Sequence, residues 1–170
     1  MKRTISLFLI MAVLIAVFCS CGLNEGKTDE SDVQESLKIR LIHKIDDAYK
    51  EKLKLSEYNT TAGKIELSEI YAEKWKQVSD EYYSKLMVYD DVVQLEEYYP
   101  SVDDFHNYIS FMKENWNEYS QDQSENYAKI LEVVYGSGSM AGSVFAEYEY
   151  EMEKDWALQL IDVCEMLNIK

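Results

Sequence analysis

The stretch "YGSGSMAGSVFAEYEYEMEKDW", Tyr135 to Trp156, decides the fold, because it can be a phosphate-binding loop, a β-hairpin or the start of a helix. A nucleotide-binding loop needs a strand before it and a second strand after its helix. Only 28 residues (170 − 142) follow Gly142, and they contain neither a strand pattern nor a Gly-Lys-Ser/Thr triplet. The glycines therefore do not predict a nucleotide site.

The alternation of glutamate and aromatic residues favours a strand only as far as Met152. Beyond it, apolar residues recur at helical spacing through "EKDWALQLIDVCEML", with no turn-forming residue between them. One continuous helical face results, made of Phe145, Tyr148, Met152, Trp156, Leu160, Val163 and Leu167. We therefore predict a helix from about Met140, with Tyr150 on its outer face and "GSGS" as the preceding loop.

The same periodicity predicts three earlier helices. The first covers Ser36 to Leu55, and "SEYNTTAG" (56–63) breaks it with turn-forming residues. The second begins near Leu67 and runs to about Tyr98, where Pro100 stops it. The third has Ser101 as its N-cap, extends to Val134, and could bend near "SQDQSEN". Residues 36–170 are thus expected to form one all-α, bundle-like domain of about four amphipathic helices.

The N-terminus has the pattern of an export signal. Basic Lys2 and Arg3 precede the apolar run Ile5 to Phe18, which is shorter than the roughly 20 residues of a membrane span. The following "FCSC" resembles a bacterial lipobox in which Cys21 would carry the lipid. We expect a signal peptide over 1–20 and a flexible tether over 21–35, anchored to the extracytoplasmic face of the membrane or in a periplasm; ordinary secretion is the alternative.

Charge and cysteine content limit the partners and the chemistry. Without Lys2 and Arg3, 15 basic residues stand against 32 acidic ones, so the mature net charge is −17. Such a field repels nucleic acid and attracts cationic partners, although acidity can also serve solubility alone. Cys164 is the one cysteine left for the domain, and its apolar surroundings predict a buried, inert thiol rather than a disulfide.

Residues for catalysis are scarce. His43 and His106 are the only histidines, and neither has a second histidine at metal-ligand spacing. His106 beside Asp103 and Asp104 could hold a metal, but an exposed polar turn is the favoured interpretation. We therefore expect no enzyme activity, no metal and no cofactor. The chain has 14 tyrosines, which can form a protein interface, serve as a glycan platform or simply cover helices.

Three segments together resemble a known family. "SDEYYSKLM", "WNEYSQDQS" and the stretch after Tyr135 are similar to motifs of the lysozyme-inhibitor LprI-like family of small extracytoplasmic domains. The matching positions are Tyr83, Leu86, Met87, Trp116, Tyr119, Gly138, Ser139 and Met140. The chain departs from the family pattern at Asp80, at Ser120 and Gln121, which replace an Arg-Asp pair, and at Ser124 and Tyr148, where the family often has cysteines.

The resemblance implies a helical, surface-anchored domain, some relatives of which bind and inhibit lysozyme. The partner expected from it is a basic lysozyme or another cationic envelope protein, with the membrane contacted only through the N-terminal lipid. The candidate binding loop is Tyr135, Gly136, Ser137, Gly138 and Ser139. The alternative function is a non-catalytic envelope scaffold, or a lipoprotein that binds glycan or another protein.

Overall fold

The computed structural model describes residues 36–96 and 98–169. The predicted signal peptide, the lipidation site at Cys21 and the 21–35 tether lie outside the described residues. The chain divides into two units, Met1–Gln34 and Glu35–Lys170, and the second is described here by itself.

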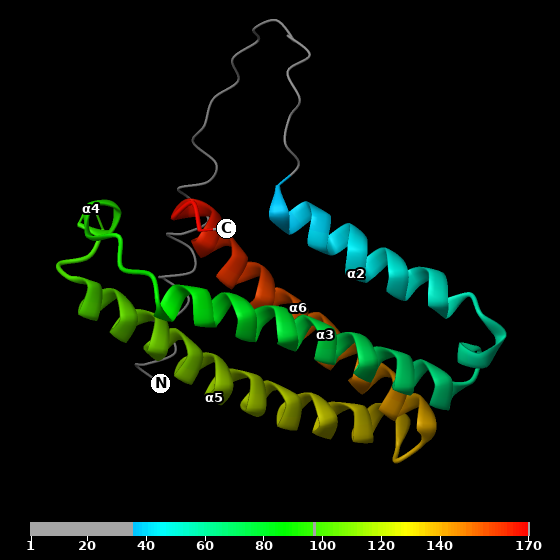
Figure 1. Ribbon diagram of the computed structural model, residues 1–170. Helices are drawn as coiled ribbons and strands as arrows, with labels where there is room; N and C mark the ends of the chain where they lie inside the picture. The colour runs from blue at the N-terminus through cyan, green and yellow to red at the C-terminus, as the bar shows by residue number, and fades with distance from the viewer. Residues whose placement is uncertain (1–35, 97, 170) are drawn as a thin grey trace, which may run out of the picture. The chain divides into compact units, whose positions relative to one another are not determined.

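The described residues form helices and no strand, which confirms the all-α prediction. The elements are α2 (Leu37–Leu53), a 3₁₀ turn η1 (Ser56–Tyr58), α3 (Thr61–Met87), the short α4 (Val92–Leu95), α5 (Val102–Tyr135) and α6 (Ser139–Met166). The predicted bend in the third helix does not interrupt it, because α5 is one continuous helix of 34 residues (Figure 1).

Side-chain caps begin four of these helices. Each cap oxygen accepts a hydrogen bond from a backbone N–H three residues later, which satisfies a donor that the helix cannot pair. The caps are Ser36 on Ile39, Thr60 on Gly63, Asp91 on Gln94 and Ser101 on Asp104. The predicted N-cap at Ser101 is thus confirmed, with an Oγ to N distance of 3.1 Å.

Helices α3 and α6 run parallel to each other at the centre of the domain and share its most extensive contact (Figure 1). Helix α2 covers one side of this pair and α5 covers the other (Figure 1). Lys38 Nζ lies 2.7 Å from Asp162 Oδ2, and this ion pair connects the start of α2 to the end of α6.

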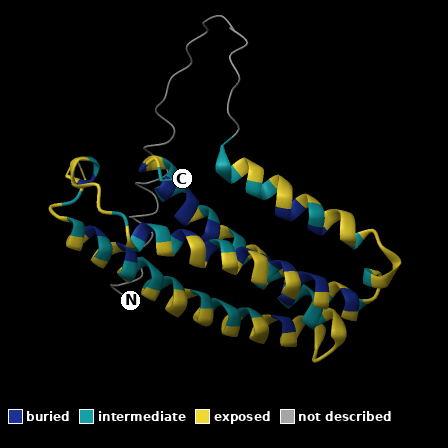
Figure 2. Ribbon diagram, in the orientation of Figure 1, coloured by how far each residue is buried: buried dark blue, intermediate teal, exposed yellow. Residues whose placement is uncertain are grey.

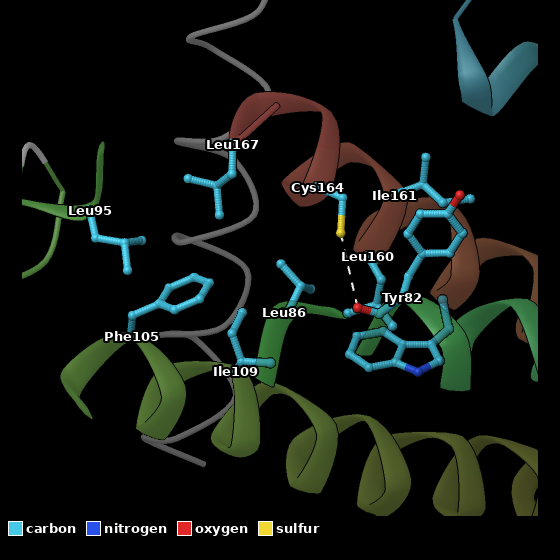
Figure 3. Close-up of a cluster of buried hydrophobic side chains, with 10 residues drawn as sticks. Tyr82, Leu86, Leu95, Phe105, Ile109, Leu160, Ile161, Cys164 and Leu167 are labelled. Atoms are coloured by element: carbon cyan, nitrogen blue, oxygen red, sulfur yellow. Dashed lines mark hydrogen bonds between the residues drawn. The ribbon is translucent and has the colours of Figure 1, made fainter. Parts of the chain in front are cut away.

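One core cluster lies where α6 ends, between α3, α4 and α5. Leu86, Phe105, Leu160 and Cys164 are completely buried there, and Leu95 of α4 closes the cluster near Leu167 (Figure 3). The thiol of Cys164 lies 4.0 Å from the carbonyl oxygen of Tyr82 and makes no disulfide, as predicted.

A second core cluster lies under α2. It consists of Ile45, Tyr49, Leu67, Tyr71, Trp75, Tyr150 and Ala157. Tyr150 is only 2% exposed, so the prediction that it lies on the outer face of α6 was wrong. Helix α6 is covered on two sides. Its α5 side holds the predicted face, including Trp156, which stacks on Trp116 at 5.2 Å between ring centroids, and Tyr150 lies on the side toward α2 and α3.

Two predictions near Pro100 were also wrong. Helix α3 ends at Met87 and not near Tyr98. A separate short helix follows it, and the Asp91 side chain caps this helix by accepting a hydrogen bond from the backbone N–H of Gln94. The hydroxyl of Tyr89 donates to Gln94 Oε1 at 2.6 Å. His106 is half-buried rather than an exposed polar turn, and its Nε2 lies 3.0 Å from the carbonyl oxygen of Tyr89.

No helix in the described part of the chain is both long enough and apolar enough to cross a membrane.

Candidate functional site

The tip of the α5–α6 hairpin is the most exposed continuous part of the described chain. All nine residues from Glu132 to Met140 are exposed (Figure 2). Apolar side chains are among them: Val134 is 63% exposed, Tyr135 46% and Met140 61%. We call these three residues and the loop Gly136–Ser139 the tip surface. It contains every residue of the predicted binding loop.

Gly136 and Gly142 have different structural roles. Gly136 has φ 67° and ψ −167°, a backbone conformation that side chains disfavour, and it ends α5 by donating its N–H to the carbonyl of Glu132 at 2.9 Å. Gly142 lies against α3, where a Cβ would come 3.2 Å from Ile65 Cδ1. The inner side of the hairpin leaves a shallow hollow of about 380 Å³ between Leu131 and Phe145.

An acidic groove of about 440 Å³ lies between α3, α5 and α6. Glu69 and Glu73 of α3 and Glu149 and Glu153 of α6 line it, with Lys76 as the one cation of the lining. Burial, and then the charge of Glu69, raise the pKa of the Glu149 carboxyl. The pKa of Glu153 is also raised, by burial and by neighbouring carboxylates, against the opposing effect of Lys76.

Helix α5 contributes only neutral side chains to this groove: Ser120, Gln121 and Ser124. These are three of the positions at which the chain departs from the family pattern. Tyr148, the other position where the family often has cysteine, packs against Tyr127 with 4.2 Å between ring centroids. Ser124 and Tyr148 therefore both lie along the α5–α6 contact.

The remaining family-motif positions divide into structural and exposed ones. Leu86 is fully buried, and the half-buried Trp116 stacks on Trp156. Tyr83 and Met87 are half-buried beside the first core cluster, and Lys113 Nζ lies 4.1 Å above the Tyr83 ring. Tyr119 is 49% exposed, and Gly138, Ser139 and Met140 belong to the tip surface. Most of the upstream motif thus builds the core, while the downstream motif is accessible.

A buried carboxylate network that the sequence pattern did not predict centres on Asp46, which is 3% exposed. Asp46 Oδ1 accepts hydrogen bonds from Tyr150 OH at 2.7 Å and from Trp75 Nε1 at 3.2 Å. Its Oδ2 lies 2.5 Å from Lys154 Nζ. Burial alone would lower the pKa of Lys154, but its hydrogen bond and its attraction to Asp46 outweigh this and raise it.

This network joins α2, α3 and α6, and it is satisfied internally. Every buried side-chain nitrogen and oxygen in the described part of the chain has a hydrogen-bond partner. Burial and the bond to Asp46 also raise the pKa of the Tyr150 hydroxyl, which keeps it a donor. Asp46 therefore holds the helices together, and we assign it no ligand.

Neither histidine lies in a metal site that the structure shows. Within residues 36–96 and 98–169, no group of three or more His, Cys, Asp or Glu side chains is arranged to hold a metal ion. His43 is exposed on α2, and His106 belongs to the contact with Tyr89.

Comparisons with models of protein families, with curated proteins and with solved structures found no match to this chain. The resemblance to the lysozyme-inhibitor LprI-like family therefore rests on the short motifs alone and stays a prediction.

Proposed function

We propose that this chain is a surface-anchored bacterial lipoprotein whose α5–α6 tip binds a basic, lysozyme-type cell-wall hydrolase and inhibits it. The observation that carries the proposal is the run of nine exposed residues from Glu132 to Met140, in which apolar Val134, Tyr135 and Met140 have no covering element in the described chain. Exposed aromatic and methionine side chains are enriched at the centres of protein interfaces.

Charge supports a basic partner. The predicted mature charge is −17, and the acidic groove adds a local concentration of carboxylates on α3 and on α6, the second helix of the tip hairpin. A negative field of this kind accelerates encounter with a cationic protein, and salt weakens the effect. The tip would supply the contact, and the surrounding charge would supply the attraction.

The direct test is a titration of residues 22–170 with a basic lysozyme, which is possible because residues 35–170 form a compact unit with its own core. Binding and the rate of wall lysis are measured at about 50 mM and about 300 mM NaCl. We expect binding that salt weakens, together with loss of lysis. Absence of binding at the lower salt concentration would contradict the proposal.

The tip itself is tested by the triple variant Val134→Ser, Tyr135→Ser, Met140→Ser. We expect at least about a tenfold loss of affinity, because these side chains would form the desolvated centre of the interface. The matched control is Val88→Ser, Val92→Ser, Val93→Ser, three residues that are 50–84% exposed in α4 or just before it. Helix α4 lies at the end of α5 away from the tip (Figure 1). Equal effects of the two triples would exclude the tip as the contact.

The second candidate is a non-catalytic envelope scaffold or glycan-binding lipoprotein. Tyr108 and Tyr119, which are 44% and 49% exposed on α5, favour it because aromatic rings offer flat contact surfaces. Binding to isolated peptidoglycan that does not change with salt, without any effect on lysis, would support this candidate over the first.

A further inference from the structure

Helix α5 has an exposed face that no other described element covers. Five apolar or aromatic side chains lie along it, each between 44% and 87% exposed: Tyr108, Phe111, Tyr119, Ile130 and Val133. Only three residues of this 34-residue helix are fully buried. At 150–250 Å² for a whole aromatic side chain, the exposed fractions leave roughly 500 Å² of apolar surface. This total is comparable to the largest apolar patch on a typical monomer, which is often functional.

The spacing of these residues places them in one straight line. With Asn115, Asp122 and Asn126 between them, the eight positions follow one another at intervals of 3, 4, 4, 3, 4, 4 and 3 residues. This is an 11-residue repeat, or about 3.67 residues per turn, which stays close to one side of a nearly straight helix. We call these eight residues the α5 stripe.

The α5 stripe is symmetric about its own midpoint, between Ser120 and Gln121. Reading outward from that point, the positions stand at equal distances on the two sides, and three of the four pairs join residues of the same character. The pairs are Tyr108 with Val133, Phe111 with Ile130, Asn115 with Asn126, and Tyr119 with Asp122. A twofold axis through the midpoint would bring a second, antiparallel α5 stripe into register, as an isologous interface requires.

We propose that the α5 stripe binds the α5 stripe of a second copy of this chain, antiparallel and in this register. Apolar side chains then meet apolar ones near both ends, the amides of Asn115 and Asn126 face each other, and the Tyr119 hydroxyl reaches the Asp122 carboxylate of the second copy. The stripe contains a single carboxylate, so charge complementarity does not favour a basic protein there. The stripe matches itself in the antiparallel register, and this match identifies a second copy of the chain as its partner.

Charges beside the stripe determine how salt acts on the dimer. Glu118 and the Glu125 of the second copy lie at nearly the same height across the twofold axis, so their carboxylates repel each other. Lys129, whose Nζ lies 4.0 Å from Glu125 Oε2, neutralises this repulsion only in part. Each copy is also strongly acidic as a whole. Added salt screens this repulsion and strengthens the dimer, whereas it weakens binding of a basic partner at the tip. The two interactions therefore respond to salt in opposite directions.

The test of association is sedimentation equilibrium of residues 22–170 at about 50 mM and about 500 mM NaCl. The α5 stripe is smaller than the roughly 800 Å² per partner of a standard interface, so we expect a weak dimer that forms only as the protein concentration rises. We expect more dimer at the higher salt concentration, and at least about a tenfold weaker dimer for Phe111→Glu. The control Val93→Glu, at a site 84% exposed on α4, should associate like the parent. A monomer at every concentration, or equal effects of the two variants, overturns the proposal.

The register is tested with single cysteines under mild oxidation. In the proposed dimer the two Asp122 positions are offset by about 4.5 Å along the helix axes, whereas the two Val133 positions are about 37 Å apart. Asp122→Cys should therefore form a disulfide-linked dimer and Val133→Cys should not. The buried Cys164 does not interfere. Equal crosslinking of both variants, or crosslinking of Val133→Cys alone, excludes this arrangement whether or not the tip binds a lysozyme.

Discussion

At the scale of single residues, Asp46 has the contacts whose loss should destabilise the domain most. Replacing it with asparagine leaves the ammonium of Lys154, whose side chain is 18% exposed, with Glu151 at 3.5 Å as the one remaining carboxylate partner among the described residues. Removing one partner of a buried ion pair is strongly destabilising, because the other charge stays buried. We expect Asp46→Asn to lower the free energy of unfolding by about 3 kcal/mol, measured by urea denaturation.

Asp47 offers the matched control for this prediction. Its side chain is 58% exposed and lies 3.8 Å from Lys50 within the same helix, so Asp47→Asn should change the free energy of unfolding by less than about 0.5 kcal/mol. Similar losses for the two variants would show that the buried network contributes no more than a surface ion pair.

Cys164 gives a second prediction at this scale. Burial raises the pKa of its thiol to about 11, so about 0.1% of it is thiolate at pH 8, and the side chain is fully buried. In residues 22–170, the reaction of Cys164 with an aromatic disulfide reagent should be at least about 100-fold slower than that of an exposed thiol introduced as Ser137→Cys. Comparable absorbance kinetics for the two would mean that α6 opens readily near its end.

At the scale of elements, the sequence predicted the type and approximate position of α2, α3, α5 and α6 because their apolar residues keep one helical period. It failed where tertiary contacts select among several possible faces. The helical period of α6 allows either Tyr148 or Tyr150 to face the core. The hydrogen bond of Tyr150 to Asp46 on α2 is what places Tyr150 inside. The end of α3 was missed for a similar reason, since Tyr89 bonds to residues that follow it in other elements.

The acidic groove yields a prediction about the faces of α3 and α6. Glu149 and Glu153 have raised pKa values in the folded state, so the folded domain holds these protons more tightly than the unfolded chain does. Their stabilising contribution is complete below the ordinary glutamate pKa of 4.5 and is lost as the pH rises through the raised values. We therefore expect Glu149→Gln to increase the unfolding free energy at pH 7.5, by at most about 1 kcal/mol, and much less at pH 4.5.

Glu147 serves as the control for this pH effect, because it is exposed on the same helix. Glu147→Gln should show a smaller change at pH 7.5 than Glu149→Gln when both are followed by urea denaturation. A stabilisation of Glu149→Gln that stays the same at both pH values would contradict the sign worked out above.

At the scale of the whole molecule, the accessible part of the candidate site was more predictable than its electrostatics. The glycine-rich loop marked the tip directly, because glycines cluster where the backbone turns. The acidic groove could not be foreseen, since Glu69 and Glu149 are 80 residues apart and meet only when α3 and α6 pack. The α5 stripe was present in the sequence as a repeat, but its exposure depends on α5 lying at the edge of the domain (Figure 2).

The net charge leads to a final prediction for the folded monomer. With 32 acidic and 15 basic residues after the predicted signal peptide, folding brings like charges together, and screening should relieve this repulsion. Surface pairs such as Lys85 with Glu81, at 2.7 Å, lose attraction at the same time, but each is worth little. We expect the unfolding midpoint to rise by a few degrees, equivalent to about 1 kcal/mol, between about 20 mM and about 300 mM NaCl.

The measurement is thermal denaturation at a protein concentration where Phe111→Glu and the parent are both monomeric, so that dimer formation contributes nothing. Replacing Glu118 and Glu125 with glutamine should reduce the rise. A midpoint that falls with salt would mean that ion pairs, rather than net repulsion, dominate the stability of this domain.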